Sequence, residues 1–359
     1  MVIDVSLCCE YLGVTEEHWT QALAALEFAN RDPLAKALAQ SVLGSLNCGD
    51  RENAVESANA AKEYYKSAAP GLVEGVYPML IALALPQTLA NLRAAGETEE
   101  IIRDTVCDYG TWVRSYFRQT GKVGFGEIGW ECNFHSGWIV KLGRLQFERS
   151  SFHAPYTVYR HKADGSLIVA PNPGAAVNAD GFLAINEPAS FTTEFVRENG
   201  VLRFNKIDYA SARILPEMVE YTADDLEPLM TTGMHIVNMH IPEVGPLDVD
   251  EVSRSLAMAK EYFMAKGYPC TVAMCESWLL DPALETYGAH SPNILSFQRR
   301  FTKFPWPSTH SDAVNRVFGR GTDASDPDAL PENSRLQKGL KAFLKTGAPL
   351  RDAGGILVL

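Results

Sequence analysis

The chain has 359 residues, of which 46% are hydrophobic and 21% charged, and its formal net charge is −12. This length predicts two domains, and the composition is that of a soluble globular protein. The negative charge argues against binding to nucleic acid or to an anionic membrane surface, because both require clustered Lys and Arg.

Nothing in the sequence indicates export. The longest apolar run near the front, Met79 to Leu85, is far shorter than the roughly 20 residues that cross a bilayer. The amino terminus lacks the basic region of a signal peptide. Seven cysteines form no Cys-x-x-Cys pair, and an odd count suits a reducing compartment. We therefore expect a cytoplasmic protein, whose oligomeric state the sequence does not predict.

The first part of the chain has helical periodicity. Asp32 and Thr98 stand at positions typical of helix N-caps, and Pro86 predicts a kink or break. Four glycines between residues 121 and 129 end this pattern, so we place a domain boundary near Trp130, with a helical domain over 1–130 and a second domain over 131–359. The last helix carries an apolar stripe that ends at Phe117. The expected helices cover residues 15–29, 33–46, 52–67, 77–95 and 98–117.

Beyond Trp130 the pattern is that of strands. Residues 138–148 alternate in part and predict one strand. Gly165 and Gly200 each lie in a short polar turn between β-rich runs, which predicts two hairpins. The remaining expectations are short helices at 224–227, 281–288, 291–301 and 334–345, and a terminal edge strand at 354–359.

The stretch from Met234 to Phe263 predicts a buried strand, a Pro/Gly turn and an amphipathic helix. Asp248 stands at the N-cap position of that helix. A second apolar run, residues 271–280, follows, so the three segments predict a strand–helix–strand unit with parallel strands. In such units ligands bind beyond the carboxyl ends of the strands, near the helix N-terminus.

Several segments between residues 143 and 337 resemble, in order, those of a family of bacterial acyltransferases. Members of this family join a helical N-acyltransferase N-terminal domain to a GNAT-like C-terminal domain. The resemblance therefore implies an α+β (mixed α/β) fold, with an all-helical domain followed by a GNAT-like mixed sheet. The resembling runs are Gly-Arg-Leu-Gln-Phe-Glu-Arg at 143–149, His-Ile-Pro-Glu-Val-Gly-Pro-Leu at 240–247, Cys-Glu-Ser-Trp-Leu-Leu-Asp-Pro-Ala-Leu at 275–284, Ser-Pro-Asn-Ile-Leu-Ser-Phe-Gln-Arg-Arg-Phe at 291–301 and Leu-Pro-Glu-Asn-Ser-Arg-Leu-Gln at 330–337.

The resemblance implies a donor, acetyl-CoA or another acyl-CoA, whose diphosphate is held by backbone N–H groups of the turn and the helix N-terminus. The turn departs from the usual GNAT pattern, because Gly245 is followed by Pro246, which has no N–H to donate. Acidic residues in the first turn of the helix would repel a diphosphate unless they point away. The residues expected to bind the donor are Ile241, Val244, Gly245, Leu247 and Arg299.

Three side chains are candidates for catalysis. His240 ends the first strand of the unit and is a candidate base, or else a histidine bonded to backbone beside the turn. Glu276 on the second strand is a candidate base whose apolar neighbours would raise its pKa, or else an exposed or ion-paired residue. Tyr287 is the one nearby substitute for the tyrosine with which GNAT enzymes protonate the departing thiolate, or else a core residue.

Other chemistries lack their motifs. No nucleophile elbow, Walker A run or dinucleotide fingerprint is present. We expect no metal site, since His235 and His240 point to opposite faces of a strand. Cys275 is expected to pack rather than react. The sequence thus predicts an N-acyltransferase that moves an acyl group from acyl-CoA to a small-molecule amine by direct attack. The alternatives are a catalytically inactive GNAT-like protein that binds a small molecule or peptide, and a helical platform for protein interaction.

Overall fold

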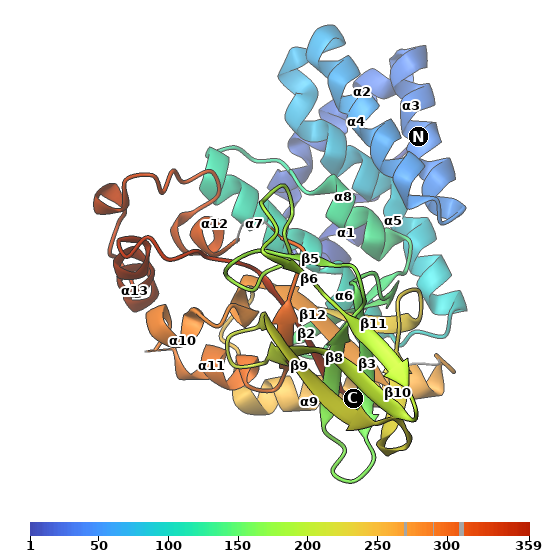
Figure 1. The fold of residues 1–359 in the computed structure, drawn as a ribbon. Helices are drawn as coiled ribbons and strands as arrows, with labels where there is room; N and C mark the ends of the chain where they lie inside the picture. Colours follow the sequence, from blue (N-terminus) through green and yellow to red (C-terminus); the bar gives the residue numbers. More distant parts are fainter. Residues whose placement is uncertain (269–270, 290, 309–311) are drawn as a thin grey trace. The chain divides into compact units, whose positions relative to one another are not determined.

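The computed structural model describes residues 1–268, 271–289, 291–308 and 312–359 (Figure 1). The chain forms two compact units. The first comprises Met1–Glu148 and Ile241–Gly245, and the second comprises Arg149–His240 and Pro246–Leu359. The segment Ile241–Gly245, which the sequence predicts as the donor-binding turn, therefore returns to the first unit.

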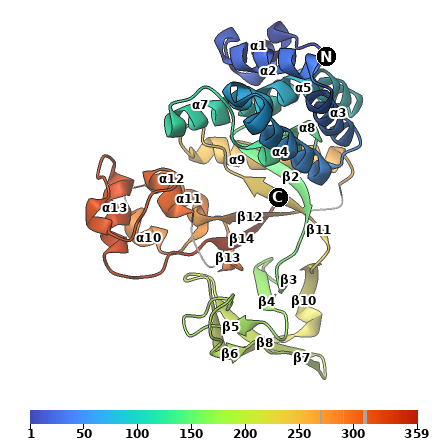
Figure 2. The same cartoon turned by 90° about the horizontal axis from the view of Figure 1, so that it is seen from above.

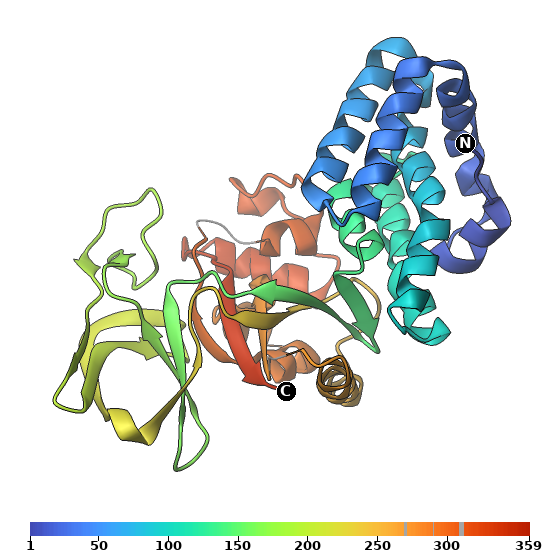
Figure 3. The same cartoon turned by 90° about the vertical axis from the view of Figure 1, so that its right-hand side faces the viewer.

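Helices make up most of the first unit, and several lie side by side in Figure 3. The predicted N-caps are confirmed, because the Asp32 and Thr98 side chains accept the backbone N–H groups of Ala35 and Ile101. The helices are α1 (Val5–Leu12), η1 (Glu16–Trp19), α2 (Thr20–Arg31), α3 (Pro33–Asn47), α4 (Arg51–Ala68), η2 (Pro70–Gly75), α5 (Val76–Ala94), α6 (Glu99–Val106), α7 (Asp108–Thr120) and α8 (Ile128–His135).

One detail of the helical expectation is wrong. The single helix expected over 98–117 is divided at Cys107 into α6 and α7, and Phe117, at the end of the expected stripe, is 54% exposed. The stripe of one straight helix does not continue through a break, so the second half presents a different face. Pro86 does not break α5, which runs on to Ala94.

The segment Pro70–Ala94 is long and apolar enough to cross a membrane by length and composition alone. Most of it, however, lies inside the first unit: 67% of its most apolar window is buried, including Met79, Leu80 and Leu85. A helix that is apolar on all sides and covered by its neighbours is the central helix of a folded core. We therefore assign α5 to the core of the helical unit.

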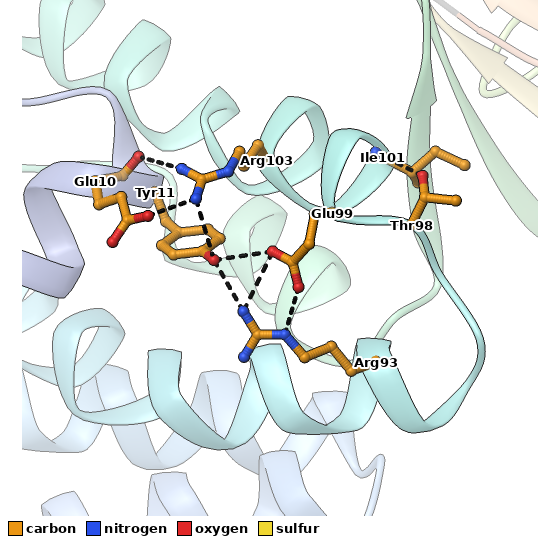
Figure 4. A network of polar contacts seen from close by, with 7 residues as sticks. All are labelled: Glu10, Tyr11, Arg93, Thr98, Glu99, Ile101 and Arg103. Atoms are coloured by element: carbon orange, nitrogen blue, oxygen red, sulfur yellow. Dashed lines mark hydrogen bonds and ion pairs between the residues drawn. The ribbon is translucent and has the colours of Figure 1, made fainter.

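A polar network joins α1, α5 and α6 (Figure 4). The Tyr11 hydroxyl donates to Glu99 and accepts from Arg93, whose guanidinium also binds the Glu99 carboxylate. Arg103 lies over the Tyr11 ring and pairs with Glu10. The Arg93 guanidinium and the Tyr11 hydroxyl lower the pKa of Glu99. The network holds three chain segments in register at the surface of the unit.

The strand expected over 138–148 is instead a hairpin. Strands β1 (Ile139–Leu142) and β2 (Leu145–Ser151) are antiparallel, with Leu142 opposite Leu145. Gly143 has φ +67° and forms the two-residue turn with Arg144, a conformation that glycine adopts without strain. The partial alternation along residues 138–148 comes from two strands. A pattern of alternation by itself does not show where the first strand ends and the second begins.

The second unit contains the predicted strand–helix–strand. Strand β11 (His235–His240), helix α9 (Val249–Ala265) and strand β12 (Val272–Ser277) follow one another, and β11 and β12 are parallel, as expected. Strand β14 (Ala353–Val358) pairs on one side with β12 and on the other with β13 (Thr302–Pro305). The expectation of a terminal edge strand is therefore wrong, because β13, which the sequence did not predict, covers the free side of β14.

Between β2 and β11 the chain forms smaller antiparallel sheets. Both hairpins predicted around Gly165 and Gly200 are confirmed, and a short 3₁₀ turn, η3 (Ala223–Asp225), precedes β10. An apolar cluster that includes Ile168, Phe204 and Leu226 joins strands of two sheets. The sheets are β10 (Leu226–Met230), β3 (Tyr156–His161) and β4 (Leu167–Pro171); β7 (Phe195–Glu198), β8 (Val201–Asp208) and β9 (Arg213–Thr222); and β5 (Ala176–Val177) with β6 (Phe191–Thr192).

The last part of the second unit consists mostly of short helices. The later ones, α10 to α13, lie close to one another in Figure 2. Ser334 and Gln337 form a complete capping box at the start of α13, where the sequence predicts a helix. Helix α13 packs so closely on α10 that a Cβ at Gly339 would lie 2.0 Å from the Tyr287 carbonyl oxygen. These helices are η4 (Trp278–Leu280), α10 (Leu284–Tyr287), α11 (Pro292–Gln298), α12 (Ala313–Phe318), η5 (Pro327–Ala329) and α13 (Arg335–Leu344).

Candidate active site

Two of the predicted catalytic residues lie near the carboxyl ends of the parallel strands β11 and β12. Val237 is opposite Ala273 and Asn238 is opposite Met274. The pairing ends there, and His240 and Glu276 lie two residues further along their strands, on the faces that carry Asn238 and Met274. The Asn238 amide lies 3.5 Å from Nε2 of His240 on that face. A histidine and a carboxylate thus end two adjacent parallel strands, where ligands bind in such sheets.

Of the two environments expected for Glu276, the structure shows the exposed one. Met274 is buried, but Glu276, two residues further on the same face, is exposed. Its partner on β14 is Gly354, where the rings of Phe304 and Trp306 occupy the space that a Cβ would take. An exposed carboxylate is not desolvated, so the argument for a raised pKa does not hold. His240, by contrast, is half-buried at the end of β11.

The turn after β11 carries backbone donors of the kind that bind anions. Gly245 has φ +61°, a left-handed conformation that requires glycine here. Within the described chain, no partner is present for the N–H groups of Glu243 and Gly245. The Val244 N–H donates to the Pro242 carbonyl at 2.8 Å, so the expectation that Val244 offers its amide is wrong. The turn can therefore present the amides on either side of Val244.

The N-terminus of α9 is capped by its own chain. One Asp248 carboxylate oxygen accepts the N–H groups of Asp250 and Glu251, at 3.0 and 3.2 Å. The predicted N-cap is confirmed, and it has a consequence that the sequence expectation did not include. A carboxylate already occupies the helix end that would otherwise attract a diphosphate, so the donors available to an anion come from the preceding turn.

The two arginines after α11 differ in what they contact. Arg299, expected to meet phosphate, instead binds Glu285 through two hydrogen bonds of 3.0 and 2.8 Å. The neighbouring Arg300 donates to the Val249 carbonyl and to the Ser253 hydroxyl, in the first turn of α9. These two adjacent residues at the helix C-terminus have different partners, and the sequence alone did not distinguish their contacts. Arg300 is thus the arginine that lies against the strand–helix–strand unit.

Tyr287 is a core residue by its surroundings. Its side chain is 3% exposed, its ring packs against Phe343, and among the described residues its hydroxyl has no hydrogen-bond partner. Burial, with the nearby charges of Asp281 and Asp352, raises the pKa of this phenol far above its usual value. The hydroxyl therefore stays protonated.

A cluster of buried polar side chains contacts the end of η4 and the residues that follow it. Asp281 accepts the backbone N–H groups of Ala283 and Arg351, and Gln298 donates to the Leu279 and Asp281 carbonyls. Burial raises the pKa of Asp281 to about 6. These contacts connect η4, α11 and the chain before β14, and so fix the end of β12.

The other reactive side chains do not form a site. Cys275 is buried, and burial raises the pKa of its thiol, so it is not a thiolate nucleophile. In the described ranges, no group of three or more His, Cys, Asp or Glu side chains is arranged to hold a metal ion.

Comparisons with known proteins agree with this architecture. Residues 4–137 match the N-acyltransferase N-terminal domain family, and residues 139–357 match the GNAT-like C-terminal domain family. No curated protein matches the chain in sequence.

Solved structures share the fold at 20% sequence identity. A mutant acyltransferase in complex with octanoyl-CoA has a TM-score of 0.62, with 99% of this chain and 87% of that chain covered. An acyltransferase in complex with CoA and 10C-teicoplanin has a TM-score of 0.57, with 92% and 80% covered. The same values hold for an acyltransferase with decanoyl-CoA and teicoplanin. With both of its parts matched by family models, the chain belongs to the acyltransferase family that joins an N-acyltransferase N-terminal domain to a GNAT-like C-terminal domain.

Proposed function

We propose that the protein transfers an acyl group from an acyl-CoA to a small-molecule amine. Membership of the family supports acyl transfer, and structures of the same fold hold octanoyl-CoA, decanoyl-CoA and teicoplanin. The observation that carries the proposal is the parallel β11–β12 pair, whose carboxyl ends carry His240 and Glu276. A base of this kind at the carboxyl end of parallel strands suits a reaction that begins with loss of a proton from an amine.

The chemistry requires one proton acceptor and one leaving group. The amine nitrogen attacks the thioester carbon, so that a C–N bond forms and the C–S bond breaks. His240, directly or through a water molecule, accepts the proton of the amine, and Glu276 stabilises the imidazolium that results. Backbone N–H groups near Ile241 stabilise the oxyanion. The departing thiolate takes a proton from His240 or from solvent, since a thiol has a pKa of about 8.5.

The donor's diphosphate is held by the turn after β11. The amides of Glu243 and Gly245 are the donors that the turn leaves unused, and Leu247 follows Pro246 as the next possible donor. The diphosphate thus lies before the helix rather than at its capped end. Ile241, Gly245 and Leu247 keep their expected roles, whereas the contacts of Arg299 and of the Val244 amide argue against theirs.

We assign the protein to the cytoplasm and expect no nucleic-acid or membrane partner. The described cysteines are free thiols, and the one long apolar helix is part of the helical core. The net charge of −12 is consistent with a small-molecule acceptor.

Release of CoA thiol from acetyl-, octanoyl- and decanoyl-CoA, measured with and without a panel of amines, tests the proposal. We expect amine-dependent release that falls by about 10²-fold or more in His240→Ala, and by a smaller factor in Glu276→Gln. His235→Ala is the matched control, because His235 starts the same strand and points to the other face. Equal activity in the wild type and both site variants would refute the assignment of the base.

A further inference from the structure

Arg144 connects the β1–β2 turn to the turn after β11. Its guanidinium donates through Nη1 to the Pro242 carbonyl and through Nη2 to the Gly245 carbonyl, both at 3.0 Å. The side chain is 9% exposed, and Pro242 is buried. All three residues belong to the first unit. A planar guanidinium bridging two carbonyls fixes the distance and orientation between them, which a flexible ammonium cannot do.

The position of Arg144 is itself well determined. The hairpin that carries it has a two-residue turn, and Leu142 and Leu145 on either side are almost fully buried. The Lys141 N–H donates to the Thr105 hydroxyl at 3.0 Å, which ties β1 to α6. The guanidinium therefore projects from a tight turn whose two flanking residues are anchored in the core.

The orientation of the two carbonyls decides where the amides of the turn point. In a planar trans peptide the C=O and N–H groups point in opposite directions. Because the Pro242 carbonyl faces Arg144, the Glu243 N–H of the same peptide faces away from it. The Gly245 carbonyl belongs to the peptide with Pro246, which has no N–H, so its bond to Arg144 fixes the turn without using a donor.

We infer that Arg144 is a positioning residue for the donor: it orients the turn so that the Glu243 and Gly245 amides face the diphosphate of acyl-CoA. This inference rests on the proposed function. The neighbouring ion pair of Arg118 with Glu243, at 2.7 Å, joins the same turn to α7, but both side chains are more than half exposed. A surface pair of this kind contributes little, so Arg118 provides the matched control.

The test compares two donors that differ only in the diphosphate-bearing part. Binding of decanoyl-CoA and of decanoyl-pantetheine is measured by titration calorimetry for the wild type, Arg144→Met, Arg144→Lys and Arg118→Met. We expect Arg144→Met to raise the Kd for decanoyl-CoA on the order of tenfold or more and to leave the Kd for decanoyl-pantetheine unchanged. Arg144→Lys is expected to be intermediate, and Arg118→Met to resemble the wild type. Equal changes for both donors, or none, would overturn the inference.

Amide hydrogen exchange of the unliganded protein separates this inference from the proposed function. Peptides that cover residues 241–247 are expected to exchange faster in Arg144→Met than in the wild type, while α2 to α5 exchange at the same rate. Unchanged exchange in the turn would overturn the positioning role even if acyl-CoA binds. Absence of acyl-CoA binding to the wild type, with faster exchange in the variant, would refute the proposed function and retain the contact. Should Arg144→Met prove unfolded by circular dichroism, Arg144→Lys supplies both measurements.

Discussion

Replacing Tyr287 with Phe separates a catalytic from a structural reading of this residue. The hydroxyl is buried without a partner among the described residues, and such a group costs about 1–3 kcal/mol. Its removal leaves the ring packed on Phe343. We therefore expect Tyr287→Phe to raise the free energy of unfolding by about 1 kcal/mol, or the Tm by about 2–4 °C for a unit of this size.

A matched substitution exists in the same unit. Tyr156 is also fully buried, but its hydroxyl donates to the Pro305 carbonyl. Tyr156→Phe removes this buried hydrogen bond, so it should destabilise the protein by about 1 kcal/mol. The two variants are expected to change stability with opposite signs in urea denaturation. Destabilisation by Tyr287→Phe of more than about 1 kcal/mol would refute this reasoning, because it would mean that the hydroxyl has a partner in solution.

The same variant tests the predicted acid role. A general acid contributes about 10²–10⁴-fold to the rate. If Tyr287 protonates the thiolate, kcat for decanoyl-CoA falls by that factor although the protein is more stable. We expect instead an unchanged kcat, because the phenol is enclosed and its pKa is far above its usual value. A large fall in kcat would restore Tyr287 to the site and require the enclosure to open.

Two further predictions concern the second unit and its packing. The pKa of Asp281 is raised from 3.8 to about 6, so its contribution to stability is full below about pH 4 and is lost as the pH rises through 6. The difference in the free energy of unfolding between Asp281→Asn and the wild type, measured by urea denaturation, should therefore shift in favour of the variant by about 1–2 kcal/mol from pH 4.5 to pH 7. A difference that stays constant over this range would contradict the burial of the Asp281 charge. Gly339→Ala should lower the stability by about 2 kcal/mol or more, because its Cβ would meet the Tyr287 carbonyl, whereas Gly44→Ala in the exposed part of α3 should be neutral or stabilising by up to about 1 kcal/mol. Calorimetric Tm values check this pair, and equal shifts would contradict the close packing of α10 and α13.

The sequence predicted the parts of the fold that depend on local signals. The N-caps Asp32, Thr98 and Asp248 each have side-chain chemistry that acts within a few residues, and all three are confirmed. The parallel pairing of β11 and β12 also followed, because a helix connects the strands. β13 was missed because its four residues include Pro305 and are too few to show the alternation of a strand. Nevertheless, β13 pairs with the side of β14 that would otherwise be a free edge.

The sequence predicted the strands, turn and helix that form the candidate site, but not the contacts that its side chains make. His240 and Glu276 were proposed separately, and the parallel pairing of β11 and β12 places both near the carboxyl ends of the pair. Strand alternation left two environments open for Glu276, apolar surroundings or exposure, and only the structure shows that the residue is exposed. Arg144 and Arg300 contact residues about 100 and 50 positions away in the chain, so no local pattern assigns their partners.

Hydrogen exchange of the wild-type protein with and without decanoyl-CoA tests the central claim most directly, because it reports on backbone amides one segment at a time. We predict that the donor slows exchange in peptides covering residues 241–248, which include the Glu243 and Gly245 amides, and has less effect on the capped first turn of α9 at residues 249–253. Binding of decanoyl-CoA with no protection of residues 241–248 would contradict the claim that this turn holds the diphosphate.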